Sequence, residues 1–442
     1  MSVIPLISHR DVDCVFAWRA GTSITVGNFL RDVEQLARQL PDKRYILNLC
    51  ADRYRFAVGF AAALSRGQTS LLPPNYTEDF VMRLNQRYLG TYCLADGQTD
   101  LLDMEVVAFP PLAIGGNTTS AEIPLISQQQ RAALVFTSGS TGAPVAHEKF
   151  WGSLCRGATA QAAQLGIVQN SGMTVLGTVP AQHMYGLEST MLLAMQNGLA
   201  LVAERPFYPH DICDSLAALP GKRCLITTPV HLRALLAEAM ALPAVEFVLC
   251  ATAHLAPQLA SAAEARFAAP LYEIYGCTEA GMVASRRTTE GAAWHLLPGV
   301  ELRQDEQGSR VCGGHIEVEA VLSDVIERNR DGSFMLHGRT ADLVNIAGKR
   351  TSLASLNHHL NAIPGVKDGV FLMPDDDVVT RPLAFVVAPG LCSEDILGVL
   401  RNCVDAVFLP RPLYFVDALP RNATGKLTRE ALLNLKQQCA KK

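Results

Sequence analysis

The sequence predicts an α/β protein with a large N-terminal domain, in which sheets are flanked by helices, and a small α+β C-terminal domain. From about residue 130, short β-branched runs alternate with longer helix-like segments, the pattern of a sheet covered by helices. The chain of 442 residues also exceeds what one hydrophobic core usually organises. We therefore expect two domains, residues 1–339 and residues 340–442.

Short apolar runs mark the strands of the large domain, and the segments between them mark its helices. Strands are expected over residues 44–50, 69–74, 133–136, 173–179, 199–203, 223–228, 245–250 and 271–275. Helices are expected over residues 55–67, 150–165, 186–196, 229–241 and 257–268. The last two helices begin near prolines, which a first helical turn tolerates because its N–H groups have no partner within the helix.

A domain boundary is predicted near residue 340, after a turn at Asp331-Gly332 that leads into a short strand. Beyond it the chain has an alternation of its own. Strands are expected over residues 366–373, 382–388 and 413–416, and helices over residues 393–404 and 428–438. This pattern predicts the small α+β domain.

Composition and charge exclude several classes of protein. Apolar residues make up 49% and charged residues 18% of the chain, as in ordinary globular proteins, and the net charge of −4 gives no basic surface for nucleic acid. The most apolar stretch, residues 191–203, is too short and too interrupted to insert in a membrane. The twelve cysteines are scattered without metal-site spacing, and no basic segment precedes an apolar N-terminal run. We expect a cytoplasmic protein with free thiols.

A loop rich in hydroxyls and glycines follows the strand expected at 133–136. It consists of Thr137, Ser138, Gly139, Ser140, Thr141 and Gly142. Hydroxyl and backbone N–H donors of such a loop can converge on one oxyanion, which suits a polyphosphate. It is not a Walker A loop, because no Gly-Lys-Ser/Thr triplet closes it. A flexible surface linker is the alternative, but phosphate loops commonly start at strand ends.

Three further segments follow this loop: IYGCTEAGMVA at 274–284, the stretch from 323 to 350, and LPRNATGKLTREAL at 419–432. Together the four motifs stand in the order typical of the acyl- and aryl-adenylate-forming superfamily. From about residue 44 to its end, the chain resembles this superfamily of acyl-CoA synthetases, peptide-synthetase adenylation domains and luciferases. One such loop could arise by chance, but the ordered set is specific.

The resemblance implies an enzyme that joins a carboxylate to the α-phosphate of ATP, releases pyrophosphate and then passes the acyl group to a thiol. Because both reactants are anions, a lysine that touches both offsets their repulsion by roughly 4 kcal/mol per pair at about 4 Å. The resemblance gives this role to Lys426, in the setting P-x-N-x-T-G-K, whereas the alternative is a solvated lysine. It also implies that the small domain is mobile, and that its rotation withdraws Lys426 and presents Gly348 to the incoming thiol.

Four more roles are implied near the middle of the chain. Glu279 matches the glutamate that is linked to Mg²⁺, a cation that prefers oxygen ligands, and Thr278 matches a donor to the α-phosphate. Tyr275 is placed to stack on the adenine. His183, in VPAQHMYGLE, matches a residue that lines the acyl pocket, although a single histidine in an apolar run is often a core residue.

The ribose is assigned to two residues. Asp324 matches the carboxylate that accepts from both ribose hydroxyls, and Arg339 lies fifteen positions later, which is the spacing in the superfamily. An ordinary turn residue is the alternative for Asp324. The usual hinge position, two residues after the arginine, is Ala341 here, and a hinge need not be polar.

Two segments depart from the superfamily pattern. Val145 stands where the phosphate loop usually has a lysine, so His147 or Lys149 is the candidate to supply a displaced positive charge. The glycine-rich turn that contacts adenine reads Ala251-Thr252-Ala253. We therefore expect the loop to hold pyrophosphate mainly through hydroxyls and backbone, with charge from Mg²⁺ and the displaced cation.

The chain is shorter than most members of the superfamily, and residues 147–152 resemble small ligases of aryl polyene or fatty-acid-like pathways. These load an aromatic or acyl acid onto an acyl carrier protein. We therefore expect an aromatic acid as substrate, with the phosphopantetheine thiol of a carrier protein, or CoA, as acceptor. The alternatives are a fatty acyl-CoA synthetase and a non-catalytic scaffold that binds nucleotide or a carrier protein. The joint presence of the implied site residues argues against the scaffold.

Overall fold

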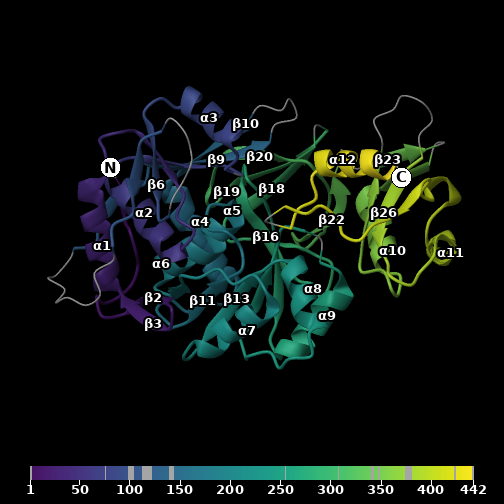
Figure 1. Cartoon of the computed structure of the whole chain (residues 1–442), viewed down its shortest axis with the longest axis horizontal. Helices are drawn as coiled ribbons and strands as arrows, with labels where there is room; N and C mark the ends of the chain where they lie inside the picture. The colour runs from purple at the N-terminus through teal and green to yellow at the C-terminus, as the bar shows by residue number, and fades with distance from the viewer. Residues whose placement is uncertain are drawn as a thin grey trace.

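The computed structural model of the chain describes residues 2–74, 76–97, 104–111, 122–138, 144–253, 255–306, 308–339, 343–346, 349–373, 381–422 and 425–440. Within these ranges, nine positions are described by their backbone alone: 78, 79, 138, 144, 339, 343, 345, 349 and 350. Figure 1 shows the course of the whole chain.

One large sheet is built from the first third of the chain. Its strands are β4 (Tyr45–Asn48), β5 (Thr69–Leu72), β6 (Thr91–Ala95), β7 (Val106–Ala108), β9 (Arg131–Ser138) and β10 (Pro144–Phe150). The order across the sheet is β10-β9-β5-β4-β6-β7, and only the β9–β10 pair is antiparallel. This hairpin flanks the hydroxyl-rich loop, whose residues 139–143 lie outside the described residues.

A second, nine-stranded sheet supplies the other half of the framework. Its strands are β2 (Val15–Arg19), β3 (Thr22–Thr25), β11 (Thr174–Gly177), β12 (Ala200–Val202), β13 (Arg223–Thr227), β14 (Val248–Cys250), β15 (Leu271–Cys277), β16 (Gly281–Arg287) and β17 (His295–Leu296). They run in the order β17-β16-β15-β14-β13-β11-β12-β2-β3. The central strands, from β2 to β15, pair in parallel. Their almost wholly apolar sequences fit burial on both faces.

Helices pack against and between these two sheets. They are α1 (Val26–Gln39), α2 (Arg53–Ser65), α3 (Glu78–Arg87), α4 (Trp151–Gln164), α5 (Met184–Gly186), a π-helix (Leu187–Leu192), α6 (Leu193–Asn197), α7 (Pro209–Ala218), α8 (Pro229–Ala237) and α9 (Pro257–Phe267). One continuous core contains residues of α2, α4 and α6 together with strands of both sheets. The helices α7, α8 and α9 contact one another beside the second sheet (Figure 1).

Three smaller sheets complete this part of the chain. Strands β18 (Val300–Asp305), β19 (Gly308–Gly313) and β20 (Ile316–Leu322) form an antiparallel sheet. The first strand, β1 (Val3–Pro5), pairs with β8 (Leu125–Ser127), and β21 (Asp324–Arg328) pairs with β22 (Phe334–Arg339).

The last hundred residues have apolar cores of their own and lie to one side of the sheets (Figure 1). Their strands are β23 (Leu343–Ile346), β24 (Lys349–Ser352), β25 (Asp368–Leu372), β26 (Leu383–Val387) and β27 (Leu413–Phe415). Their helices are α10 (Leu353–Asn361), α11 (Ser393–Cys403), a 3₁₀ turn (Ala406–Phe408) and α12 (Arg429–Cys439). Residues 340–342 and Gly348 lie outside the described residues, so the division at residue 340 and the hinge at Ala341 stay predictions.

The strands and helices expected from the sequence are present, with one clear correction. The single helix expected over residues 186–196 is instead α5, a π-helix and α6 in succession. Gly186, which ends α5, lies so close to Pro180 that a Cβ atom there would be 1.9 Å from the Pro180 carbonyl oxygen. Several elements were not anticipated, among them α1, α7, α10 and the β18–β20 sheet.

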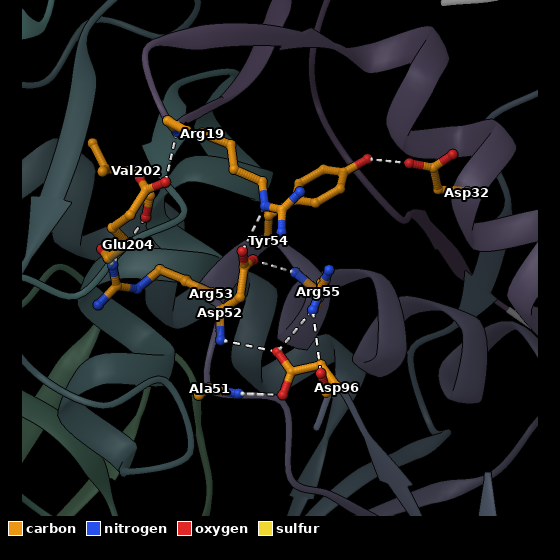
Figure 2. A network of polar contacts seen from close by, with 11 residues as sticks. Arg19, Asp32, Ala51, Asp52, Arg53, Tyr54, Arg55, Asp96, Val202 and Glu204 are labelled. Carbon is orange, nitrogen blue, oxygen red and sulfur yellow. Dashed lines mark hydrogen bonds and ion pairs between the residues drawn. The ribbon is translucent and has the colours of Figure 1, made fainter. Parts of the chain in front are cut away.

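A buried arginine ties α2 to the second sheet. Arg53 is 2% exposed and begins α2, immediately after the N-cap residue Asp52. Its guanidinium donates to carbonyl oxygens at or just beyond the ends of β11 and β12, at 2.8 to 3.2 Å: Gly177, Val179, Val202 and Glu204. Figure 2 shows that Asp52 also pairs with Arg19 of β2, and that Asp96 accepts from the backbone before α2. These contacts fix one sheet relative to the other.

Candidate active site

The two strands that flank the hydroxyl-rich loop present polar side chains to the turn between β15 and β16. Thr137 Oγ1 lies 3.0 Å from His147 Nε2, across the β9–β10 hairpin. The same His147 nitrogen lies 3.7 Å from Glu279 Oε1. Burial lowers the pKa of His147, which the nearby Glu279 carboxylate partly opposes. The first residue of the loop and the predicted Mg²⁺ residue are therefore neighbours, although they are far apart in the sequence.

Gly139, Ser140, Thr141 and Gly142 lie outside the described residues, and Ser138 is described by its backbone in β9. Val145 is 47% exposed on β10. An exposed valine at this position supplies no charge to an anion, so any positive charge must come from elsewhere.

Thr278 and Glu279 lie in the tight turn that joins β15 to β16. The Glu279 side chain is 45% exposed, whereas its backbone carbonyl accepts a hydrogen bond of 2.9 Å from the Lys149 ammonium. Lys149 itself is only 6% exposed. The turn depends on Gly281, whose φ of +79° is unfavourable for other residues.

Asp324 and Arg339 occupy directly opposite positions in the β21–β22 pair. The residues between them form a hairpin, which brings Arg339 back opposite Asp324. The Tyr275 hydroxyl donates to Asp324 Oδ2 at 2.7 Å, and the tyrosine ring packs near Trp294 and Phe334. The side chain of Arg339 lies outside the described residues. The structure thus joins two of the three predicted nucleoside contacts, Tyr275 and Asp324.

His183 lies at the N-cap of α5, beyond the end of β11. Burial, together with the positive charges of Lys426 and Arg205, lowers its pKa to about 4. An imidazole with this pKa is neutral at pH 7. The charge of the C-terminal lysine therefore acts on His183, although the two residues are distant in the sequence.

Lys426 is held in a compact turn. Its N–H donates to Asn422 Oδ1 at 2.9 Å, and its carbonyl accepts from the Asn422 N–H at 2.9 Å. The preceding Gly425 has a φ of +76°, and a Cβ atom there would lie 3.2 Å from Cγ2 of Val230 in α8. The turn therefore packs closely against the first turn of α8.

A second contact joins the segment around the Lys426 turn to α8. Arg233 of α8 lies 3.8 Å from Asp368, which also pairs with Arg421 at 2.8 Å. The Arg421 guanidinium in turn donates to the Gly425 carbonyl at 2.9 Å. Partly exposed ion pairs contribute little stability individually, but this chain of contacts aligns the Lys426 turn with α8.

Sequence reasoning missed Glu188, and it noted the adenine-contacting turn at Thr252 only as a departure from the superfamily pattern. Glu188 is a buried carboxylate within the apolar segment 187–195, and a single acid in such a run was the available signal. Thr252 follows β14 and has a φ of +82°, which glycine adopts far more readily than a β-branched residue. The turn therefore keeps a glycine-like conformation without the glycine.

Glu279 is the residue that fits a magnesium ion. Among the described residues, no group of three or more His, Cys, Asp or Glu side chains is placed to hold a metal. Mg²⁺ is commonly bound by one or two carboxylates, with water and substrate phosphates as the other ligands. A half-exposed carboxylate beside a phosphate-type loop meets that requirement.

Comparison with known proteins identifies the family. The model of the AMP-binding enzyme family matches residues 94–321. A 4-coumarate–CoA ligase of Rhodobacter capsulatus is 30% identical over 307 residues, which cover 68% of this chain and 76% of the relative. The chain belongs to the AMP-binding enzyme family.

Solved structures agree with this assignment at the level of the fold. The o-succinylbenzoate CoA synthetase of Bacillus subtilis, bound to its acyl-adenylate, has a TM-score of 0.83 at 17% identity and covers 98% of each chain. That synthetase has also been solved with ATP and a magnesium ion. An anthranilate CoA ligase bound to anthranoyl-AMP has a TM-score of 0.78 at 15% identity, covering 99% of this chain and 98% of that one.

The predicted fold class and the resemblance to adenylate-forming enzymes are confirmed. This AMP-binding enzyme is an AMP-forming acid–thiol ligase. The roles of individual residues stay predictions. None of the helices in the described part of the chain has the length and apolar character needed to cross a lipid bilayer.

Proposed function

We propose that the enzyme uses ATP and Mg²⁺ to activate an aromatic carboxylic acid as its acyl-adenylate, and then transfers the acyl group to the thiol of an acyl carrier protein or of CoA. The observation that carries the first step is the position of Lys426. The turn that holds it packs on α8, and its charge acts on His183. A cation of the C-terminal segment therefore reaches the predicted acyl side of the site.

In the adenylation step, a carboxylate oxygen attacks the α-phosphorus and pyrophosphate leaves. The Lys426 ammonium lies between the two anionic reactants and offsets their repulsion, an effect of several kcal/mol in a partly desolvated site. Thr278 donates to the α-phosphate, and the loop beginning at Thr137 holds the leaving phosphates. Glu279 would hold Mg²⁺, which would supply the charge neutralisation that Val145 does not.

The β21–β22 pair holds the nucleoside. Asp324 accepts from the ribose hydroxyls, and its orientation is fixed by the 2.7 Å hydrogen bond from Tyr275. Arg339, opposite Asp324 in the hairpin, contributes the second ribose contact. The tyrosine ring provides the adenine-facing surface.

Two observations support an aromatic acid. The relatives named above act on 4-coumarate, o-succinylbenzoate and anthranilate, which are all aromatic acids. His183 is neutral at pH 7, so the acyl side of the site presents an uncharged ring beside Lys426. A neutral ring packs well against an aromatic ring, while Lys426 attracts the carboxylate.

The acceptor has two candidates. The curated relative is a CoA ligase, which supports CoA. Residues 147–152, with their H-x-K and Trp-Gly pattern, resemble the small ligases that load carrier proteins, which supports a phosphopantetheine thiol. CoA and a holo carrier protein both present a phosphopantetheine thiol, so the two acceptors must be compared directly.

Carboxylate-dependent exchange of ATP with labelled pyrophosphate, over a panel of benzoates, cinnamates and straight-chain acids, tests the proposed substrate class. We expect exchange with aromatic acids. Exchange only with straight-chain acids would support a fatty acyl-CoA synthetase instead, and no exchange with any acid would support a scaffold. Mass spectrometry of CoA and of a holo carrier protein incubated with the best acid then identifies the acceptor.

A further inference from the structure

Two side chains on one face of β10 contact the same residue. His147 and Lys149 are two positions apart on the strand, so they point the same way. His147 Nε2 lies 3.7 Å from the Glu279 carboxylate, and the Lys149 ammonium donates to the Glu279 backbone carbonyl at 2.9 Å. The strand that leaves the phosphate loop therefore contacts Glu279 at both its side chain and its backbone.

Glu188, in the π-helix, contacts the other end of the same turn. It is 4% exposed, and the Met282 backbone lowers the pKa of its carboxylate, against the effect of burial. Its Oε1 atom lies 2.6 Å from where a Cβ atom of Gly281 would be. The glycine is thus needed both for its positive φ and for the space that Glu188 occupies.

Lys149 and Glu188 are both buried, and each opposes the effect of burial on the pKa of the other. Burial lowers the pKa of Lys149, and Glu188 is the acid that opposes this most strongly. Burial raises the pKa of Glu188 to about 7, and Lys149 is the main charge that opposes it. A buried charge left without its opposite is strongly destabilising, so removing one member alone affects the fold as well as the site.

We propose that Lys149 and Glu188 are positioning residues, which together hold the Thr278–Glu279 turn in the geometry that binds Mg²⁺ with ATP. Lys149 fixes the Glu279 backbone, and Glu188 fixes Gly281 and Met282 on the far side of the turn. The pair links the strand of the phosphate loop to the adenylate turn. The inference rests on the proposed role of Glu279 within the proposed function.

This assignment differs from the expectation that Lys149 supplies the charge missing at Val145. The ammonium is buried and donates to a backbone carbonyl. Lys149 therefore acts on ATP through Glu279 rather than by touching a phosphate.

Calorimetric titration with ATP, in Mg²⁺ and in EDTA, distinguishes these roles in wild type and Lys149→Met. Loss of a residue that orients a metal ligand typically costs about 10–100-fold in metal affinity. We expect Lys149→Met to weaken binding of ATP with Mg²⁺ to this extent, and to change binding in EDTA by much less. Equal weakening in both conditions would overturn the proposal, because it indicates a direct phosphate contact.

The double variant Lys149→Met/Glu188→Gln separates positioning from folding. The single variant leaves Glu188 buried without its opposite charge, so its melting temperature falls. We expect the double variant to recover the melting temperature but not Mg²⁺-dependent ATP binding. Recovery of both would overturn the proposal, because the pair would then be structural only. Lys222→Met, at an exposed position outside the site, is the matched control.

Because the readout is ATP binding, it needs neither the acid nor the acceptor. If no acid supports exchange while the binding results hold, the proposed function fails and the positioning role stands. If wild type binds ATP equally well with and without Mg²⁺, the role of Glu279 is wrong and the inference falls with it.

Discussion

Under the proposed function, adenylation depends most on the Lys426 side chain. Replacing it by alanine is expected to slow adenylation by about 10²–10³-fold, the loss typical of removing one group that stabilises a transition state. Transfer of the acyl group from preformed acyl-adenylate to a thiol should lose far less, because that step has no second anion to approach. Pyrophosphate exchange and a transfer assay measure the two steps separately.

Lys367→Ala is the matched control for this experiment, because Lys367 is an exposed lysine of the same C-terminal segment. It should leave both steps unchanged. An equal loss of both steps in Lys426→Ala would contradict the assigned division between adenylation and transfer.

Three histidines with lowered pKa values make stability sensitive to acid. Burial lowers the pKa of His9, His183 and His315 to about 4. In the unfolded chain these groups titrate near 6.5, so between pH 6.5 and 4 the unfolded state binds more protons. The free energy of unfolding should therefore fall as the pH falls through this window, with a limiting slope of about 1.4 kcal/mol per pH unit for each histidine.

Urea denaturation at pH 7.5, 6, 5 and 4.5 measures this dependence. His315→Leu should reduce by about one the difference in bound protons between the unfolded and folded states. The free energy of unfolding should then depend less on pH between pH 6.5 and 4. An unchanged slope in this variant would show that His315 is protonated equally in both states.

At the scale of single elements, α9 ends at a residue that glycine would suit better. Its C-cap, Ala268, is exposed and adopts a left-handed conformation with φ of 50°. Ala268→Gly should therefore raise the free energy of unfolding by about 0.5–1 kcal/mol, since glycine takes this conformation without steric cost. Chemical denaturation measures whether Ala268→Gly raises or lowers the free energy of unfolding.

Ala265→Gly, at an exposed position inside the same helix, is the control. Glycine in a helix interior costs about 0.5–1 kcal/mol relative to alanine, so the two substitutions should act in opposite directions. The same sign for both would show that the conformation at Ala268 does not decide the effect.

The π-helix shows where an element-level prediction ends. Periodicity correctly indicates helical structure from about residue 186, but it cannot indicate the wider turn. The π-helix lies where Gly186 packs close to Pro180 and Glu188 packs close to Gly281, contacts between separate segments. The helix α10 was missed for a simpler reason, since its nine residues carry only a short apolar pattern.

At the scale of the whole molecule, the proposed function implies that adenylation requires the C-terminal segment to pack against α8. Gly425→Ala would place a methyl group 3.2 Å from Val230 Cγ2 and strain a residue whose φ is +76°. We expect adenylation to fall by about 10²-fold, because small displacements of a catalytic group are costly. Thiol transfer from preformed adenylate should be nearly unaffected.

Gly390→Ala is the matched control, because Gly390 has a φ of +88° but nothing within 4 Å of the added methyl group. Both variants should lose about 1–2 kcal/mol of stability from backbone strain. Only Gly425→Ala should slow adenylation. If both variants slow it equally, backbone strain rather than the contact with α8 is responsible.

The sequence by itself determined the central strands of both large sheets, most helices, the order of the motifs and the family, because apolar periodicity and short motifs are local properties of the chain. The superfamily's spacing also indicated that Asp324 and Arg339 act together, and the structure places them opposite each other in a hairpin.

Only the tertiary structure decided what Lys149 and Glu188 contact. Lys149 reaches a carbonyl 130 positions away, and Glu188 occupies the space beside Gly281. Such contacts follow from how two sheets and their helices pack together. No local pattern encodes that arrangement, because it depends on the shape of the whole core.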